Sequence, residues 1–279
     1  MWKPEHRLAA ERHGLRYPSD LTNAEWALVE PMIPPARRGG RPRDVNVREV
    51  LNAIFYVLST GCQWNALPKD LPPKSTAHYY FMLWDWDGTL ERIHHWLYVA
   101  AREQVGREAS PTAAIIDSQS ARAAQKGAFA LDPQGFDAGK KVKGRKRHIL
   151  VDTLGLLLSV VVHPADVQDR DGARQVLRTA RRLFPFIDRI FADAGYQGPK
   201  MAKAVADTGW TIEIVKRSDA HRFVVLPKRW IVERTFAWIS RNRRLARDFE
   251  RYARSVAAFI RLAMIRVMLR RLTKPTPCL

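Results

Sequence analysis

The chain has 279 residues, of which 46% are hydrophobic and 27% are charged, so it is long enough to bury an ordinary core. Lysine and arginine total 47 against 28 aspartate and glutamate residues; this net charge of +19 favours a polyanionic partner such as nucleic acid. Two cysteines exclude a disulfide framework, and the charges of Arg261 and Arg266 within the most apolar stretch, 256–269, exclude a membrane-spanning protein.

The first part of the chain is predicted to be helical. Residues 1–20 are polar, lack the apolar core of a signal peptide, and are predicted to form a loose segment. The region 21–107 follows as a helical domain, with a basic loop at 36–44. Apolar residues at helical spacing predict helices over 23–32, 46–59, 77–86 and 90–105. Helix–turn–helix DNA-binding domains have this organisation, and so do many small bundles, so the pattern favours the two equally.

From residue 111 the pattern changes to alternating strands and helices, which we interpret as a second domain over 111–272. A β-hairpin start followed by this alternation is typical of an α/β fold with a mixed sheet and helices on both faces, and its order matches the ribonuclease H-like fold. The predicted strands are 112–116, 149–151, 156–162, 187–192 and 210–215, and the predicted helices are 168–184, 199–208, 226–247 and 255–272.

The helix predicted over 226–247 carries one carboxylate on an arginine-lined face. On a helical wheel of about 100° per residue, Glu233 shares its face with Arg229, Ser240, Arg244 and Arg247. A lone acid among arginines fits an ordinary ion pair, and it equally fits a metal ligand that faces a polyanion.

Two aspartates directly follow short apolar strands: Asp117 after AAII and Asp193 after IFA. The carboxyl ends of strands in an open α/β sheet are where such sheets bind ligands. Close carboxylates repel unless a proton or cation lies between them, and hard divalent cations prefer such oxygens. Two such ions can activate a nucleophile and stabilise the leaving oxygen of a phosphodiester. Each acid alone is as well explained by a strand-end cap or surface ion pair; together with Glu233, they predict a metal site.

Several motifs resemble the DDE transposases of bacterial insertion sequences, specifically the insertion-sequence-five group. In the second domain these are IIDSQS (115–120), GRKRHILVDTLGL (144–156), FADAGYQG (191–198) and RWIVERTFAWISRNRRLARDFE (229–250). In the first they are LTNAEWALVEPMIP, GRPR, STGCQWNALP and STAHYYFMLWDWDG. The resemblance covers about residues 21 to 250.

The resemblance implies a ribonuclease H-like catalytic domain that uses divalent metal for DNA cleavage and strand transfer at terminal inverted repeats. By motif position its catalytic and metal-binding triad is Asp117, Asp193 and Glu233. The family's glutamate motif has a tyrosine and a lysine where this chain has Leu226 and Ser240. Arg241 or Arg244 is expected to take over the phosphate contact of that lysine.

Six basic residues occupy eight positions at 140–147, a run that we interpret as a phosphate-contacting loop, with a solvated charged loop as the alternative. The expected DNA-binding residues are Lys140, Lys141, Lys143, Arg145, Lys146, Arg147, Arg229, Arg241 and Arg244. Two other acidic sites are set aside: Asp152 is interpreted as turn chemistry, and Asp169 with Asp171 as an incomplete calcium loop.

These observations together predict a transposase that binds its element's inverted repeats and target DNA, with Mg²⁺ or Mn²⁺, two ions in all, as cofactor. Cutting two ends requires at least two subunits, so we expect a homodimer on double-stranded DNA. The expected location is cytoplasmic and nucleoid-associated, without membrane contact. Two alternatives remain: a metal-dependent nuclease or resolvase without strand transfer, and a non-catalytic DNA-binding repressor.

Overall fold

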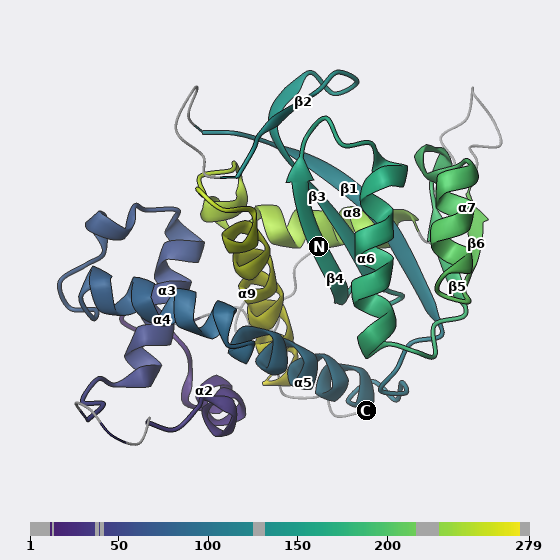
Figure 1. Ribbon diagram of the computed structural model, residues 1–279. Coiled ribbons are helices and arrows are strands. Elements are labelled where there is room, and N and C mark those ends of the chain that lie inside the picture. Colours follow the sequence, from purple (N-terminus) through teal and green to yellow (C-terminus); the bar gives the residue numbers. More distant parts are fainter. Residues whose placement is uncertain are drawn as a thin grey trace, which may run out of the picture.

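The computed structural model describes residues 12, 14–36, 39, 42–124, 132–215 and 229–273. Within this part the first hundred residues are helical, as predicted (Figure 1). The helices are α2 (Asn23–Val29), α3 (Val47–Thr60), α4 (Lys74–Trp86) and α5 (Thr89–Glu103), with short 3-10 turns at η1 (Glu30–Met32) and η2 (Trp64–Ala66).

Local capping explains where the first helices begin and end. Thr22 and Glu25 form a capping box: the Thr22 hydroxyl accepts from the Glu25 backbone N–H, and the Glu25 carboxylate accepts from the Thr22 N–H. Asn46 caps α3 in the same way through its side-chain oxygen. Gly61 ends α3 in the left-handed region, at φ 72°, which glycine adopts without steric cost.

Within the described residues, six strands form one mixed sheet in the order β2-β3-β1-β5-β6, and β4 also pairs with β3. β1 is antiparallel to β3 but parallel to β5, and β5 is parallel to β6. The strands are β1 (Ala113–Arg122), β2 (Gly135–Asp137), β3 (Val142–Asp152), β4 (Leu157–Pro164), β5 (Arg189–Ala192) and β6 (Thr211–Ile214).

Helices cover both faces of this sheet. α6 lies across one face with α7 beside it, and α8 lies on the opposite face together with α9 (Figure 1). The helix bounds are α6 (Asp169–Leu183), α7 (Pro199–Ala206), α8 (Arg229–Ser240) and α9 (Ala253–Leu272), and 3-10 turns lie at η3 (Ala194–Tyr196) and η4 (Arg243–Leu245).

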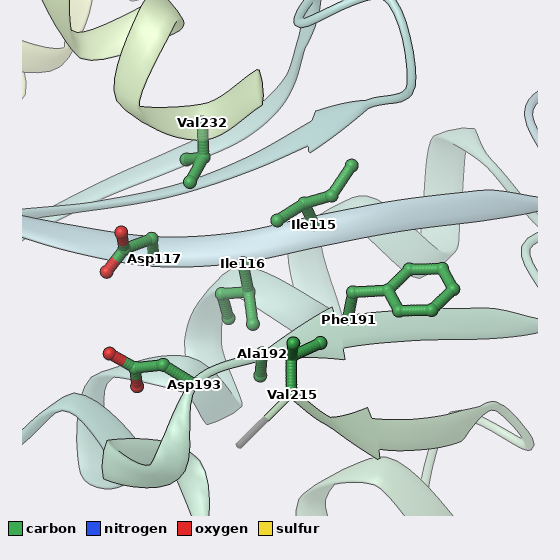
Figure 2. A pocket seen from close by; sticks show the side chains of 8 residues that line it. All are labelled: Ile115, Ile116, Asp117, Phe191, Ala192, Asp193, Val215 and Val232. Atoms are coloured by element: carbon green, nitrogen blue, oxygen red, sulfur yellow. The ribbon is translucent and has the colours of Figure 1, made fainter. Parts of the chain in front are cut away.

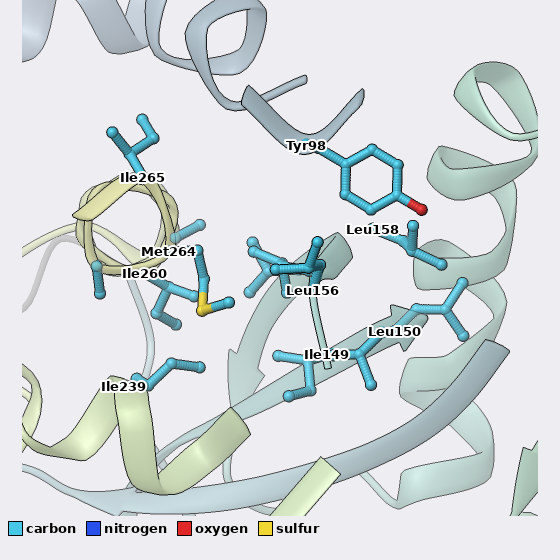
Figure 3. Packing of buried hydrophobic residues seen from close by; sticks show 14 of the residues in the cluster. Tyr98, Ile149, Leu150, Leu156, Leu158, Ile239, Ile260, Met264 and Ile265 are labelled. Carbon is cyan, nitrogen blue, oxygen red and sulfur yellow. The ribbon is translucent and has the colours of Figure 1, made fainter. Parts of the chain in front are cut away.

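Helix α9 is buried along most of its length and joins the helical region to the sheet. Ile260 and Met264 face Ile149 and Leu156 of the hairpin, and Ile239 of α8 closes the same cluster (Figure 3). On its other sides α9 packs against α2, α3, α4 and α5. The two regions that the sequence separates at about residue 110 therefore share one hydrophobic core, which extends from Leu21 to Leu269.

The predicted fold class is confirmed: a mixed sheet with flanking helices follows a helical region, as in the ribonuclease H-like fold. Part of the segment predicted to be loose is bonded to the body, since Arg12 pairs with Glu25 and the Tyr17 hydroxyl donates to Asp70. Residues 1–11 and 13 lie outside the described residues. None of the described helices combines the length and apolar character that a membrane crossing requires.

Three predicted bounds are corrected. The helix expected over 226–247 ends at Ser240, and residues 226–228 lie outside the described part of the chain. β1 continues through Asp117 to Arg122, because it keeps pairing with β3 after its pairing with β5 has stopped at Ile115. The basic run expected in a loop enters β3 at Val142.

Candidate active site

Asp117 and Asp193 are brought together by the parallel pairing of β1 and β5. The last registered pair is Ile115 with Phe191, so each aspartate lies two residues beyond it on its own segment. Asp117 continues along β1, whereas Asp193 leaves β5 and caps η3, where its Oδ1 accepts the Gly195 N–H at 2.9 Å. Both side chains are half-buried. The two carboxylates therefore occupy the same rim of the sheet.

Figure 2 shows the two carboxylates pointing to the same side of a small apolar pocket. Ile115 and Ile116 of β1, Phe191 and Ala192 of β5, and Val215 form its base, and Val232 of α8 lies over it. Apolar walls around two acids strengthen their mutual repulsion, because the local dielectric is low. Such a pair favours a cation between its oxygens.

Glu233 is the residue after Val232, but its exposed side chain lines a neighbouring groove. This groove, of about 400 Å³, runs between β1 and α8 and is lined by Ser118, Gln119, Ser120, Lys140, Glu233, Phe236, Ala237 and Ser240. Glu233 thus lines this groove, whereas Asp117 and Asp193 line the pocket, and the two hollows share no described lining residue.

The geometry matches a metal site only in part. Among the residues that the structure describes, no group of three or more histidine, cysteine, aspartate or glutamate side chains is close enough to hold a metal ion. The oxygens of Asp117 and Asp193 have the chemistry that a hard divalent cation requires. Glu233 lines the neighbouring groove, so the three carboxylates do not form one ligand set in this structure.

The sequence missed a further carboxylate at the same rim, Asp169. It opens α6, accepts a hydrogen bond from the Ser118 hydroxyl at 2.7 Å, and lies 3.1 Å from the Lys146 ammonium. Burial raises the pKa of Asp169, but the Ser118 hydroxyl and Lys146 outweigh it, so its pKa lies below the usual value. Lys146 also approaches Asp137 of β2 at 3.6 Å. Ser118 and Ser120 alternate along β1, and Ser120 pairs with Lys146 of β3. This polar patch on one face of the sheet was the signal from which a carboxylate partner could have been expected.

Tyr196 is buried within the electrostatic influence of these acids. Burial raises the pKa of its hydroxyl, and the charges of Asp117, Asp169 and Asp193 raise it further, so it stays protonated. Gly195 allows this close arrangement, because a Cβ there would stand 3.1 Å from Asp193 Oδ1 and 3.5 Å from Asp169 Oδ2. The turn after Asp193 therefore holds an uncharged hydroxyl next to three carboxylates.

The basic run at 140–147 divides into two halves with different surroundings. Lys140 and Lys141 in the β2–β3 turn and Lys143 at the start of β3 are exposed. Arg145, Lys146 and Arg147 are buried within β3, with exposed fractions of 1%, 6% and 1%. The expectation of a phosphate-contacting loop is therefore corrected for the second half, since those side chains lie under α6 or under the segment that precedes α9.

Internal partners account for the two buried arginines. Arg145 donates to the Asp248 carboxylate at 3.0 Å and to the backbone carbonyls of Asp132, Glu250 and Arg251. Arg147 donates to the Leu245 carbonyl at 2.8 Å, and burial lowers its pKa to about 10. Both hold the 245–251 segment against β3.

The arginines of the glutamate helix are also placed differently from the wheel. Because α8 ends at Ser240, Arg244 falls on η4 instead of the Glu233 face. It is buried, pairs with Glu250 at 2.6 Å and donates to the Cys62 carbonyl, so its expected phosphate contact is corrected. Arg241 is exposed at the end of α8. Arg229 is the first residue of α8, and its side chain lies outside the described part.

Asp152 does the turn chemistry that the sequence predicted. Its Oδ1 accepts the backbone N–H groups of Leu154 and Leu156 across the β3–β4 turn. It is also fully buried and forms an ion pair with Arg102 of α5. This pair ties the helical region to the hairpin.

The comparisons with known families agree with this geometry. Residues 108–268 match the family described as transposase DDE domain, which is more than half of the chain. The chain belongs to this family. Residues 21–94 match a second family, described as putative transposase of the IS4/5 family. The resemblance that the motifs indicated is thereby confirmed.

Two relatives come from Burkholderia cepacia. A putative transposase for insertion sequence element IS402 is 32% identical over 136 residues, which are 43% of this chain and 60% of that protein. An insertion element IS402 uncharacterized 16.2 kDa protein is 34% identical over 104 residues, which are 35% of this chain and 69% of that protein. The chain thus spans less than two thirds of the first relative's length.

Proposed function

We propose that this chain is a transposase, which binds the terminal inverted repeats of an insertion sequence and catalyses metal-dependent strand cleavage and strand transfer. The observation that carries the proposal is the pair of carboxylates of Asp117 and Asp193 at one rim of a ribonuclease H-like sheet. Membership of the transposase DDE domain family supports the reaction type.

In this proposal Asp117 and Asp193 hold the cation, and Glu233 joins them when DNA occupies the neighbouring groove. Two Mg²⁺ or Mn²⁺ ions would activate the attacking water or the 3′-hydroxyl of the DNA and would stabilise the leaving oxygen. Tyr196 stays protonated beside the acids and can donate a hydrogen bond to a carboxylate. Lys146 lowers the repulsion that Asp169 adds to the site.

The groove beside Glu233 suits a DNA strand end. Lys140, in the β2–β3 turn, lines the same groove as Ser240. Ser240 occupies the position at which the family has a lysine, so Lys140 can supply the missing positive charge. Lys141 is exposed on the same turn and Lys143 at the adjoining start of β3, and Arg229 lies one helical turn before Glu233. We assign these four residues to phosphate contacts, whereas Arg145, Lys146, Arg147 and Arg244 keep structural roles.

The helical region is proposed to bind the inverted repeats, and two copies of the chain are proposed to act together on two ends. The net charge of +19 supports binding to duplex DNA. The shared core around α9 supports a rigid link between the bound end and the carboxylate pair.

The decisive experiment compares Glu233→Gln with Glu213→Gln in cleavage of duplex DNA that carries the element ends, with Mg²⁺. Glu213 is an exposed acid on β6 and serves as the matched control. We expect Glu233→Gln to slow cleavage by about 100-fold or more, since metal catalysis supplies several kcal/mol of stabilisation. Cleavage equal to that of the control would show that Glu233 is not a catalytic residue.

Two further assays separate the alternatives. Calorimetric titration of Mn²⁺ should show weaker binding to Asp117→Asn than to the parent chain, independently of any cleavage. Supplying pre-cut 3′-hydroxyl ends with a target plasmid should give joined products. Cleavage without joining would identify a nuclease or resolvase, and Mn²⁺ binding unchanged by Asp117→Asn would favour a non-catalytic DNA-binding protein.

A further inference from the structure

A second cavity, of about 450 Å³, lies between the end of α8, one side of α9 and the chain around Arg12 and Pro18. We call it the basic cavity, because Arg12, Arg241, Arg266 and Arg270 all line it. No aspartate or glutamate is among its described lining residues. It is separate from the carboxylate pair, with which it shares no lining residue.

The charges in the basic cavity are incompletely balanced. Arg12 is paired, since its two terminal nitrogens lie 2.8 and 2.7 Å from the Glu25 carboxylate. Arg266 has only a 3.4 Å contact with the Asn242 oxygen and the Phe55 ring beneath it. Among the described acids, no carboxylate lies within ion-pair distance of Arg241, Arg266 or Arg270.

The electrostatics of Arg266 agree with this imbalance. Burial lowers its pKa to about 9, and the neighbouring charges of Arg270 and Arg12 contribute in the same direction. Burial and Arg12 also lower the pKa of Arg270, while the Glu25 carboxylate acts in the opposite direction on both arginines. A cluster of four guanidinium groups with the single nearby carboxylate of Glu25 is stabilised by a further anion, and the planar guanidinium fork matches phosphate oxygens in particular.

We propose that the basic cavity binds phosphate groups of the DNA backbone. Arg241 and Arg270 are exposed, so a DNA strand can reach the cavity from solvent. Helix α8 connects it with the groove beside Glu233: Ala237 and Ser240 line the groove, while Trp238 and Arg241 line the cavity. One duplex can therefore be held on both sides of α8. The inference rests on the proposed function for the choice of DNA as the source of phosphate.

The test measures affinity for duplex DNA carrying the element ends, without divalent metal, at several salt concentrations. Each phosphate contact contributes about 0.9 to the slope of log affinity against log salt. We expect Arg241→Gln and Arg270→Gln each to lower that slope by about 1 and to weaken binding by about 5- to 10-fold. Arg178→Gln is the matched control, since Arg178 is exposed on α6 and should leave the slope unchanged.

A second arm uses inorganic pyrophosphate as probe and thermal unfolding as readout. Wild type should melt at higher temperature with millimolar pyrophosphate, and the two cavity variants should lose that shift. If pyrophosphate stabilises only wild type but the DNA slope stays unchanged, the cavity binds free phosphates and the DNA assignment is overturned. An unchanged slope together with no pyrophosphate shift overturns the site itself. Neither arm contains a divalent metal or measures cleavage. A negative result here therefore overturns the phosphate site alone, whereas the proposed catalytic function is tested by cleavage with Glu233→Gln.

Discussion

The buried arginines of β3 and the arginines of the basic cavity differ in how their charges are met. In β3, Arg145 is enclosed by the Asp248 carboxylate and by backbone carbonyls of segments on both sides of it. In the basic cavity, Arg266 has one long polar contact and other cations as neighbours. Arg145 has a buried carboxylate as its partner, whereas in the basic cavity Glu25 pairs with Arg12 and no described carboxylate pairs with Arg241, Arg266 or Arg270.

This difference separates structural arginines from those that we propose to bind DNA better than position in the sequence does. Arg145 lies in the densest basic run of the chain, yet its contacts hold the segment before α9 in place. The arginines of the basic cavity are scattered between Arg12 and Arg270 and are assembled only by the fold. Removing Arg145 should therefore lower stability, whereas removing Arg266 or Arg270, which lack a carboxylate partner among the described residues, should leave or raise it.

The largest expected effect is that of Arg145→Met. It leaves Asp248 buried without its cation, which should cost about 3–5 kcal/mol of unfolding free energy. Urea unfolding of the full chain measures it, with Arg178→Met as the control, where a change within about 0.5 kcal/mol is expected. A loss as small as that of the control would contradict the structural role of Arg145.

A smaller effect on the unfolding free energy is expected from two histidines that are uncharged in the folded state. His94 and His148 are buried, and burial lowers the pKa of each to about 3. In the unfolded chain a histidine titrates near 6.5, so below that pH the unfolded state binds more protons than the folded state. This contribution to stability is complete above pH 6.5 and falls with pH, by about 1–2 kcal/mol per histidine between pH 6.5 and 5.

The measurement is urea unfolding at several pH values from 7 to 5. In the variant His148→Leu the unfolding free energy should depend less steeply on pH. The difference should equal the contribution of one histidine, since leucine does not titrate. His163, which is half-exposed beside His148, provides the control: His163→Gln should leave most of the slope in place. Equal slopes for wild type and His148→Leu would show that His148 is already protonated in the fold.

The sequence predicted the elements whose patterns are local. The apolar stripe of α3, the β3–β4 hairpin and the strand before Asp193 all follow from spacing and from turn residues. The proximity of Asp117 and Asp193 was also predictable, because parallel strands end at one rim. The assignment of Glu233 as the third carboxylate had to be inferred from the family resemblance. No periodicity in the sequence predicts how its helix lies against the sheet.

Local sequence patterns do not predict side-chain contacts between segments that are far apart in the chain. Arg145 meets its partner 103 residues further on, and Arg244 reaches the carbonyl of Cys62, 182 residues away. The wheel placed Arg244 beside Glu233 only because the helix was extended through Asn242, where the chain turns. Asp169 was set aside as part of an incomplete calcium loop, whereas its actual partners, Ser118 and Lys146, come from two other strands.

The smallest predicted effect has the opposite sign and bears most directly on the comparison. Arg266→Met replaces a cation without a carboxylate partner by an apolar side chain of similar length, beside Phe55 and Val267. Because desolvated charge and repulsion from Arg270 disappear, the unfolding free energy should rise by about 1 kcal/mol. In a chain of this size that raises the melting temperature by about 2 °C. Arg270→Met, at the exposed rim of the same cavity, should change stability by less than half as much. If Arg266→Met instead destabilised the fold as Arg145→Met does, the contacts with Asn242 and Phe55 would suffice to hold the charge, and the two groups of arginines would be alike.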